Sequence, residues 1–266
     1  MKNIDYEKLF ELIILEVKFW QNIKNARSKF ERSKIFDDFY PSFIEKVKSV
    51  FGTYGGFDER IVDIIFHCCK NKDILELGCG DSKLSHLLGS TVNSYVGVDI
   101  SVNNYKNKNY EIIKQNLILF DNNFLKDKKF DIIYSNDFVE HLYEEDLYNL
   151  MDFLIKNHLK KNGIIITITP SFLTGHKDSI DYLNIPKGLL FGTHLTVKSA
   201  KEWEIFFNNW GGVSKIYCNS YKTAKFFKNI DLFLLPPSAH DFIIKSRIRN
   251  FFRISEGVVM KTIFKE

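Results

Sequence analysis

The chain has 266 residues, 45% of them hydrophobic and 25 of them Phe, which is enough for one large domain with a sizeable core. Its net charge of +4 is too small to indicate a nucleic-acid-binding protein, and no run of about 20 apolar residues could span a bilayer. The N-terminus lacks the pattern of a signal peptide, and the four cysteines lack metal-ligand spacing. We therefore expect a reduced, cytoplasmic protein without DNA as a partner, and its oligomeric state stays open.

The start of the chain is expected to form a helical arm. Apolar residues recur on one helical face within residues 4–50, namely Leu9, Ile13, Val17 and Trp20. Pro41 is expected to open a second helix, because proline suits the first turn of a helix. The arm, residues 1–57, is either a packing element or a lid over a pocket in the main domain, residues 58–266. In the second case Tyr54 would lie near that pocket.

The strongest pattern in the sequence lies in residues 72–101. Two apolar runs end on the acids Glu76 and Asp99, and a glycine turn and a short helix separate them, so a parallel βαβ unit is predicted. Gly78 and Gly80 lack side chains, which lets a ligand approach the backbone at the carboxyl end of the first strand. Asp99 ends the second strand, where a carboxylate can accept hydrogen bonds from both hydroxyls of a ribose. The unit therefore predicts a nucleoside pocket.

Two classes of nucleoside cofactor compete for this pocket. A dinucleotide fingerprint needs a third glycine where this chain has Lys83. The acid-first run ELGCGDS, which begins at Glu76, instead resembles motif I of the class I S-adenosylmethionine-dependent methyltransferases, with Ser82 in place of the last glycine. This resemblance implies S-adenosyl-L-methionine as the cofactor and S-adenosyl-L-homocysteine as the product. It also implies an α/β, Rossmann-like fold with a seven-stranded, mostly parallel sheet and an antiparallel last strand.

Further features agree with the resemblance in their order along the chain. Residues 110–115 are predicted as the third strand, and the fourth, residues 130–134, matches the FDxV signature of the family. An amphipathic helix at residues 144–159 ends at a Lys-Asn-Gly stop signal. The fifth strand, residues 164–169, is followed by a proline, as is typical of these enzymes. The resemblance covers about residues 58–219.

The resemblance also implies where the cofactor binds. The cofactor-binding residues that it indicates are Glu76, Gly78, Cys79, Gly80, Asp99, Ile100, Asn116, Leu117 and Asn136. Asn116 takes a position that is often Asp in the family, where the side chain meets the exocyclic amine of adenine. The side-chain carbonyl of Asn can accept the same hydrogen bond. Asn136 follows the fourth strand and is expected beside the methionine portion of the cofactor.

His141 is the first candidate for a catalytic base. It follows the fourth strand, where the acceptor and the methyl group should meet, and its unperturbed pKa of about 6.5 suits proton removal near neutral pH. His194 and Glu140 are further catalytic candidates that are expected to face the same cavity. The alternative is that His141 only shapes the pocket.

The same residues offer a possible set of metal ligands. Asp137, Glu140, His141 and His194 supply oxygen and nitrogen atoms that are compatible with a divalent cation. The set resembles the E-x-x-E-H plus distant His site of small-RNA 3′-terminal 2′-O-methyltransferases. The first acid is Asp here, and the H-x-H pattern around the distant histidine is missing. We therefore expect that no metal is bound.

An insertion, residues 219–255, separates the last two strands and is expected to be helical. Its basic residues are Lys222, Lys225, Lys228, Lys245, Arg247, Arg249 and Arg253. The wider segment 212–266 holds ten Lys and Arg against four Asp and Glu. Such a run is either a solvated helix face or a substrate cap that attracts an anionic acceptor.

Together these expectations describe an S-adenosylmethionine-dependent O-methyltransferase with a small polar acceptor. The basic insertion suits an anionic acceptor, such as a sugar, a nucleotide-sugar or another phosphate-bearing precursor of a bacterial surface glycan. Amino methylation of nucleic-acid bases is disfavoured, because the [D/N]-P-P-[Y/F] run after the fourth strand is absent. The alternatives are a metal-assisted RNA 2′-O-methyltransferase, an NAD-dependent oxidoreductase, or a binding module that holds the cofactor without turnover.

Overall fold

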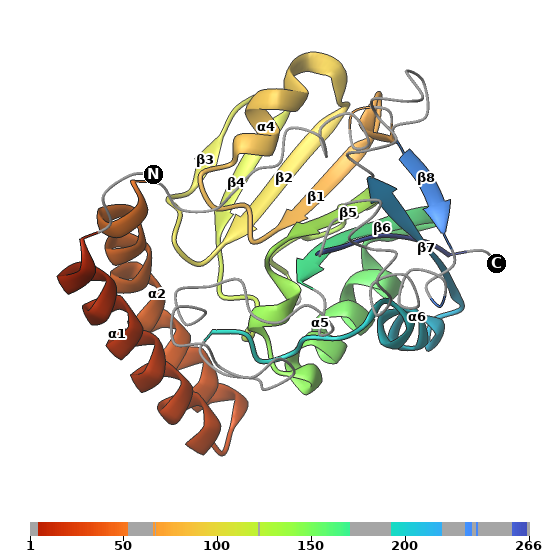
Figure 1. Cartoon of the computed structure of the whole chain (residues 1–266). Helices are drawn as coiled ribbons and strands as arrows, with labels where there is room; N and C mark the ends of the chain where they lie inside the picture. Colours follow the sequence, from red (N-terminus) through yellow and green to blue (C-terminus); the bar gives the residue numbers. More distant parts are fainter. Residues whose placement is uncertain are drawn as a thin grey trace, which may run out of the picture.

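The described residues form a nine-stranded sheet with the strand order β3-β4-β2-β1-β5-β6-β9-β7-β8 (Figure 1). This computed structural model describes residues 5–52, 66, 68–121, 123–170, 193–219, 232–235, 238 and 257–264. The strands are β1 (Asp73–Leu77), β2 (Ser94–Asp99), β3 (Tyr105–Lys106), β4 (Tyr110–Lys114), β5 (Phe130–Asn136), β6 (Leu159–Pro170), β7 (Gly212–Asn219), β8 (Leu232–Leu235) and β9 (Gly257–Phe264).

The pairing of the strands confirms the predicted fold class. β4, β2, β1, β5 and β6 are parallel to one another. β9 lies between β6 and β7 and is antiparallel to both. These seven strands make the expected mostly parallel sheet. Two short strands extend it, because β3 pairs with β4 and β8 pairs with β7. β8 belongs to the insertion at residues 219–255, so this part of the insertion is a strand where helix was expected. Most of the rest lies outside the described residues.

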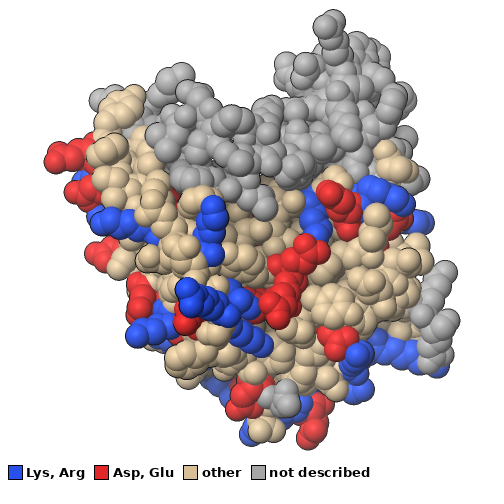
Figure 2. All heavy atoms as spheres, turned by 90° about the horizontal axis from the view of Figure 1, so that it is seen from below, with Lys and Arg blue, Asp and Glu red and all other residues tan. Residues whose placement is uncertain are grey.

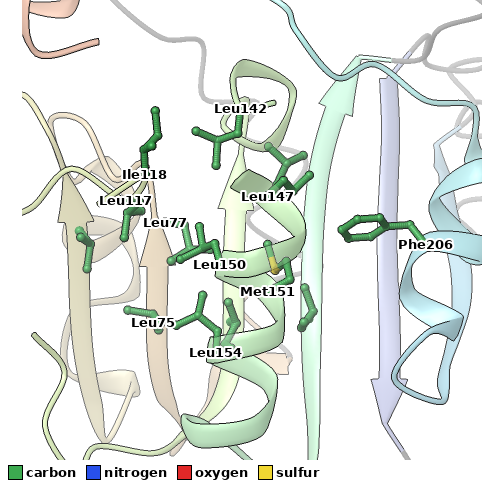
Figure 3. Close-up of a cluster of buried hydrophobic side chains, with 14 of the residues drawn as sticks. Leu75, Leu77, Leu117, Ile118, Leu142, Leu147, Leu150, Met151, Leu154 and Phe206 are labelled. Carbon is green, nitrogen blue, oxygen red and sulfur yellow. The ribbon is translucent and has the colours of Figure 1, made fainter. Parts of the chain in front are cut away.

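Helices cover both faces of the sheet, as parallel strands require (Figure 1). They are α4 (Lys83–Leu88), the 3-10 turns η1 (Gly89–Thr91) and η2 (Val139–His141), α5 (Glu144–Asn157) and α6 (Ala200–Asn208). Leucines of β1 and α5 interlock on one face, where Leu75, Leu77, Leu147, Leu150 and Leu154 are fully buried (Figure 3). Burying one such side chain contributes about 1.5–3 kcal/mol, so this layer fixes the strand ends that carry the site.

The N-terminal arm is a helical hairpin beside the carboxyl ends of the central strands (Figure 1). It consists of α1 (Tyr6–Asn25) and α2 (Lys29–Phe51). α2 begins at Ser28, whose hydroxyl accepts a hydrogen bond from the backbone N–H of Glu31, and ends at Gly52 in the left-handed region with φ 79°. The expectation that Pro41 opens a helix is wrong, because α2 passes through it. Aromatic residues on both sides of the proline are buried, and their packing outweighs its cost of about 3 kcal/mol; they are Phe36, Phe39, Tyr40 and Phe43.

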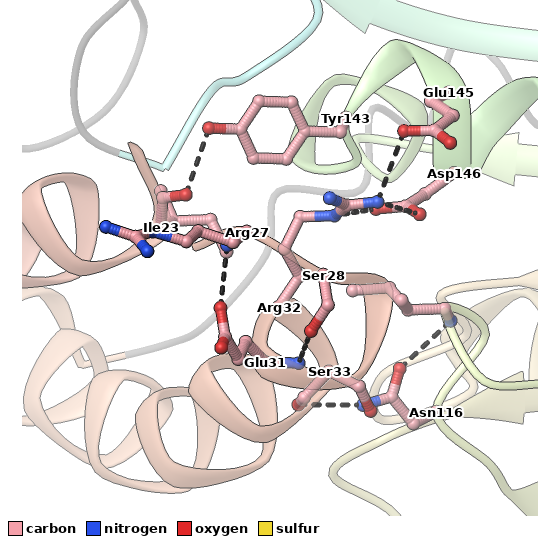
Figure 4. A network of polar contacts seen from close by, with 11 residues as sticks. Ile23, Arg27, Ser28, Glu31, Arg32, Ser33, Asn116, Tyr143, Glu145 and Asp146 are labelled. Carbon is pink, nitrogen blue, oxygen red and sulfur yellow. Dashed lines mark hydrogen bonds and ion pairs between the residues drawn. The ribbon is translucent and has the colours of Figure 1, made fainter. Parts of the chain in front are cut away.

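Polar contacts attach this hairpin to the rest of the molecule (Figure 4). Arg32 of α2 donates two hydrogen bonds, of 2.6 and 2.7 Å, to the carboxylate of Asp146 at the start of α5. The hydroxyl of Tyr143 donates to the carbonyl of Ile23, at 3.1 Å. The Arg32 and Asp146 side chains are 11% and 1% exposed, so the pair is shielded from solvent.

Some expected features fall outside the described residues. Tyr54 is among them. Of the segment before β1, residues 66, 68 and 69 are described and are helical. Within the described part of the chain, no helix has the length and apolar character that a membrane crossing needs.

Candidate active site

The glycine turn after β1 forms the floor of the candidate cofactor site. Gly78 and Gly80 have φ values of +69° and +48°, in the region that favours glycine. A Cβ on Gly78 would lie 2.7 Å from the ring of Phe138, so no larger residue fits there. The backbone N–H of Gly78 donates to the carbonyl of Val98 in β2, at 2.8 Å. The turn is therefore held against the ends of β2 and β5.

Asp99 stands at the end of β2 with its carboxylate already oriented. Its Oδ2 accepts a hydrogen bond from the N–H of Gly80, at 3.0 Å. Its Oδ1 accepts from the N–H and the hydroxyl of Ser101, at 2.7 and 2.6 Å. This arrangement is compatible with the predicted ribose contact, because carboxylate oxygens can accept more than one hydrogen bond each. Ile100 follows it and is partly buried against the core.

Glu76 and Cys79 lie below the turn. The carboxyl of Glu76 is buried and accepts a hydrogen bond from the hydroxyl of Tyr95. Burial raises the pKa of Glu76 to about 8, against the hydrogen bond from Tyr95, which lowers it. The Cys79 side chain is also buried and fills the space beside Gly97, where a Cβ would lie 2.9 Å from its sulfur. Both residues thus support the turn from beneath, and their side chains contact protein groups.

Asn116 and Leu117 follow β4, next to Asp99 in the sheet. The Asn116 amide donates to the carbonyl and hydroxyl of Ser33, at 3.1 and 2.8 Å (Figure 4). It also donates to Oδ1 of Asp37, at 3.0 Å. Its own Oδ1 accepts from the N–H of Ile118, at 3.0 Å. Leu117 is buried in the core. The expected adenine-binding side chain is thus engaged by α2, a contact that the sequence pattern did not predict.

The predicted catalytic residues do come together. His141 lies in η2, and its ring centroid is 5.0 Å from that of His194. The backbone N–H groups of Leu195 and Thr196 both donate to the carbonyl of Glu140, at 2.7 and 2.9 Å. These bonds hold the segment that carries His194 against η2. Asn136, at the end of β5, is half-buried just before this turn.

The hydrogen bonds of His141 define its protonation. Its Nδ1 lies 2.9 Å from the carbonyl oxygen of Thr193, which can only accept, so Nδ1 carries the hydrogen. Burial lowers the pKa of His141 to about 4, and the hydrogen bond to Thr193 opposes this shift. The ring is therefore neutral near pH 7 and has a lone pair on Nε2. Tyr40 of α2 packs edge-on against this ring, with centroids 6.1 Å apart.

The same cluster offers ligand atoms for a cation. One atom each from Glu140, His141 and His194 lie within 4.8 Å of one another. Glu140 is fully buried and its Oε2 accepts from the hydroxyl of Thr169, at 3.1 Å, whereas its Oε1 has no hydrogen-bond partner among the described residues. Burial, together with the nearby charge of Asp137, raises the pKa of Glu140. A cation would offset both effects, so these residues fit a divalent ion.

A cavity of about 670 Å³ opens beside the glycine turn, between α4, β4 and α2. Its walls include Gly80, Ser85, Ser101, Tyr110, Ile44 and Lys48. Lys48 lies 3.5 Å from the carboxylate of Asp81. Ile44 and Lys48 belong to α2, so the arm contributes to the surroundings of the turn. The helical periodicity of the arm did not predict that α2 lines this cavity, because Ile44 is apolar and Lys48 is charged.

Comparisons with known proteins agree on the class of the domain. A family model described as a methyltransferase domain, Methyltransf_23, matches residues 57–211. The ubiquinone biosynthesis O-methyltransferase of Pelagibacter ubique (strain HTCC1062) is 34% identical over 148 residues, which are 52% of this chain and 56% of that protein. The match thus spans little more than half the length of this relative.

The solved structures that match are more distant in sequence. YcgJ from Bacillus subtilis is 13% identical, with a TM-score of 0.48 over 79% of this chain and 100% of its own. The N-methyltransferase NodS from Bradyrhizobium japonicum WM9, in complex with S-adenosylhomocysteine, is 11% identical, with a TM-score of 0.47 over 78% of this chain and 87% of its own.

Proposed function

Because the chain belongs to the methyltransferase-domain family whose model matches residues 57–211, we propose that it transfers a methyl group to a hydroxyl oxygen of a small acceptor. S-adenosylmethionine is the cofactor and methyl donor, and S-adenosylhomocysteine is the product. Membership of this family identifies the cofactor as S-adenosylmethionine and not a dinucleotide, so an NAD-dependent oxidoreductase is excluded. The atom that is methylated and the acceptor are the proposed part.

The proposal that oxygen is the methylated atom rests on the protonation state of His141. Methyl transfer from a sulfonium is an in-line displacement, in which the protein aligns nucleophile, methyl carbon and sulfur. A hydroxyl acceptor must also lose its proton, and a neutral imidazole can take it through its Nε2 lone pair. The bond from Nδ1 to the Thr193 carbonyl fixes the ring in this tautomer. The name of the curated relative, an O-methyltransferase, supports the same atom.

The strength of this base bears on the acceptor. With a pKa of about 4, His141 is a weak base. Deprotonation by a weak base is easier for a phenolic hydroxyl, with a pKa of about 10 as in Tyr, than for the less acidic hydroxyl of a sugar. We therefore favour a phenolic or similarly acidic hydroxyl. The glycan-precursor acceptor expected from the basic insertion has no support from the comparisons, and the cations of Lys222–Arg253 lie outside the described residues.

A second candidate is metal-assisted transfer, which the cluster of Glu140, His141 and His194 favours. A divalent cation held there would lower the pKa of a bound hydroxyl, so that a sugar or ribose hydroxyl could react. His141 would then be a ligand rather than the base. An RNA acceptor would also need a basic surface, and on the face in Figure 2 the described Lys and Arg lie among Asp and Glu without an extended basic patch.

An acceptor screen with labelled S-adenosylmethionine separates these proposals. The purified protein is incubated with simple phenols, catechols, sugars, nucleotide-sugars and a short RNA, each with and without EDTA. We expect label in the phenolic acceptors, at an equal rate with EDTA. Transfer only to sugars or RNA, abolished by EDTA and restored by magnesium or manganese, would replace the first proposal with the second. Methylation of amines alone would contradict both.

A further inference from the structure

Helix α2 contacts the ends of several strands with one face. Its residues Ser33 and Asp37 meet Asn116 after β4, and Tyr40 packs against His141 after β5. About two turns further along, Lys48 meets Asp81 beside the glycine turn. The helix thus lies over the edge of the sheet at which open α/β sheets bind their ligands.

The side chain of Asn116 has few hydrogen-bonding groups left to bind adenine. Its amide group has two hydrogens, and three oxygens of Ser33 and Asp37 lie within 3.1 Å of the amide nitrogen. Its Oδ1 already accepts the N–H of Ile118. An Asx-type bond of this kind orients the loop that follows β4. Asn116 therefore acts first as a link between this loop and α2.

Asp37 brings a charged acceptor to the same place. Among the described residues, its carboxylate takes part in a single hydrogen bond, in which Oδ1 accepts from Asn116 at 3.0 Å. The side chain is exposed, and Oδ2 has no hydrogen bond or ion pair within the described part of the chain. A hydrogen bond from an amine to a carboxylate is stronger than one to a neutral amide oxygen.

Hydrogen bonds connect Asn116 and Asp37 to the predicted ribose site. The backbone N–H of Gln115 donates to the carbonyl of Asp99, at 3.0 Å, so Asn116 comes one residue after the contact with the predicted ribose site. Ile100, on the loop after β2, is a partly buried apolar side chain beside this point. A base attached to a ribose at Asp99 would thus extend toward Asn116 and α2.

We propose that Asp37, on the N-terminal helix, accepts the hydrogen bond from the exocyclic amine of the cofactor's adenine and thereby sets the base specificity of the site. This inference rests on S-adenosylmethionine as the cofactor and not on the identity of the acceptor. It makes α2 part of the cofactor site. The exocyclic amine is the group that distinguishes adenine from hypoxanthine, in which an oxygen replaces it.

Calorimetry with two ligands tests this proposal. S-adenosylhomocysteine carries the amine, and S-inosylhomocysteine carries a carbonyl oxygen in its place. We expect the wild-type protein to prefer the adenosyl ligand at least about tenfold, because the inosyl oxygen would face a carboxylate. In Asp37→Asn the side-chain oxygen can still accept from Asn116, while its NH₂ group can donate to the inosyl oxygen. The preference should then fall to near unity or reverse.

Two control variants separate specificity from docking of the arm. Asp38→Asn removes the same charge from the neighbouring exposed position and should keep the full preference. Ser33→Ala removes one acceptor of the Asn116 amide and should change the affinities for both ligands by the same factor. If Asp37→Asn keeps the wild-type preference for the adenosyl ligand, with or without an equal loss of affinity for both ligands, the proposal is wrong. If wild-type protein bound neither ligand, the cofactor assignment itself would fail.

Discussion

His141 shows how one side chain can serve two different mechanisms. As the base it needs its Nε2 lone pair for the acceptor, and as a metal ligand it gives the same lone pair to the cation. The contact from Nδ1 to Thr193 is compatible with both, since metal-bound histidines commonly donate their other N–H to a carbonyl. Substitution and pH dependence can distinguish the two.

For His141→Ala we expect kcat to fall about a hundredfold or more, because a positioned general base contributes this much, while the affinity for S-adenosylhomocysteine stays the same. His194→Ala is the matched comparison, measured by steady-state kinetics with the best acceptor of the screen. If His141 is the base, His194→Ala should be the milder change. Equal losses in both variants, together with lost binding of manganese, would instead indicate a cation site. Near wild-type turnover in His141→Ala would leave this residue as a pocket wall.

The pH profile gives a second test of the same residue. A base is active in its neutral form, which exists above its pKa, and burial lowers the pKa of His141 to about 4. We therefore expect kcat/KM to show no inflection from His141 near pH 6.5 and to decline only as the pH falls toward about 4. Measurements from pH 4.5 to 8, with a stability check at each pH, are sufficient. An inflection near pH 6.5 that disappears in His141→Ala would contradict the assigned environment.

At the scale of elements, one shielded ion pair is among the contacts that dock the N-terminal hairpin. Arg32 and Asp146 join α2 to the first turn of α5, and Asp146 is 1% exposed. Removal of one partner of such a pair leaves a buried charge without compensation. We therefore expect the pair to contribute to the docking of α2.

Arg32→Ala should lower the free energy of unfolding by about 3–5 kcal/mol, or release the hairpin locally, because the Asp146 carboxylate remains buried. Urea unfolding measures the first effect, and hydrogen exchange in residues 6–51 measures the second. Lys46→Ala breaks the exposed pair with Glu11 in the same hairpin and should cost less than about 1 kcal/mol. A similar small effect for Arg32→Ala would show that the aromatic packing alone holds the hairpin.

The elements also show what the sequence can and cannot predict. The βαβ unit and its acids were correct because period, glycine turn and strand ends are local signals. Pro41 was misjudged because the packing of distant aromatic residues outweighed a local preference. The contacts of Asn116 with Ser33 and Asp37 could not be predicted, since they join residues about 80 positions apart through tertiary packing. The pairing of His141 with His194 was expected from their roles in the resembling family.

At the scale of the whole molecule, the site is divided between two parts of the chain. The sheet provides the glycine turn, Asp99 and the cluster around His141, as the motifs predicted. The arm, expected as residues 1–57, provides Ser33, Asp37 and Tyr40, which contact loops after two different strands. A lid function for the arm remains a prediction, and α2 contacts both Asn116 after β4 and His141 after β5.

The position of β9 has a consequence for how the protein folds. β9 fills the gap between β6 and β7, with seven residue pairs to β6 and six to β7. Until residues 257–264 have been synthesised, β6 has an unpaired edge with the apolar run Ile164–Ile168, and the paired strands β7 and β8 have no strand that joins them to β6. Such long-range pairing is slow to form, and an open apolar edge invites association with other chains. Nascent or C-terminally truncated chains should therefore aggregate through β6, although their cofactor-binding half is already complete.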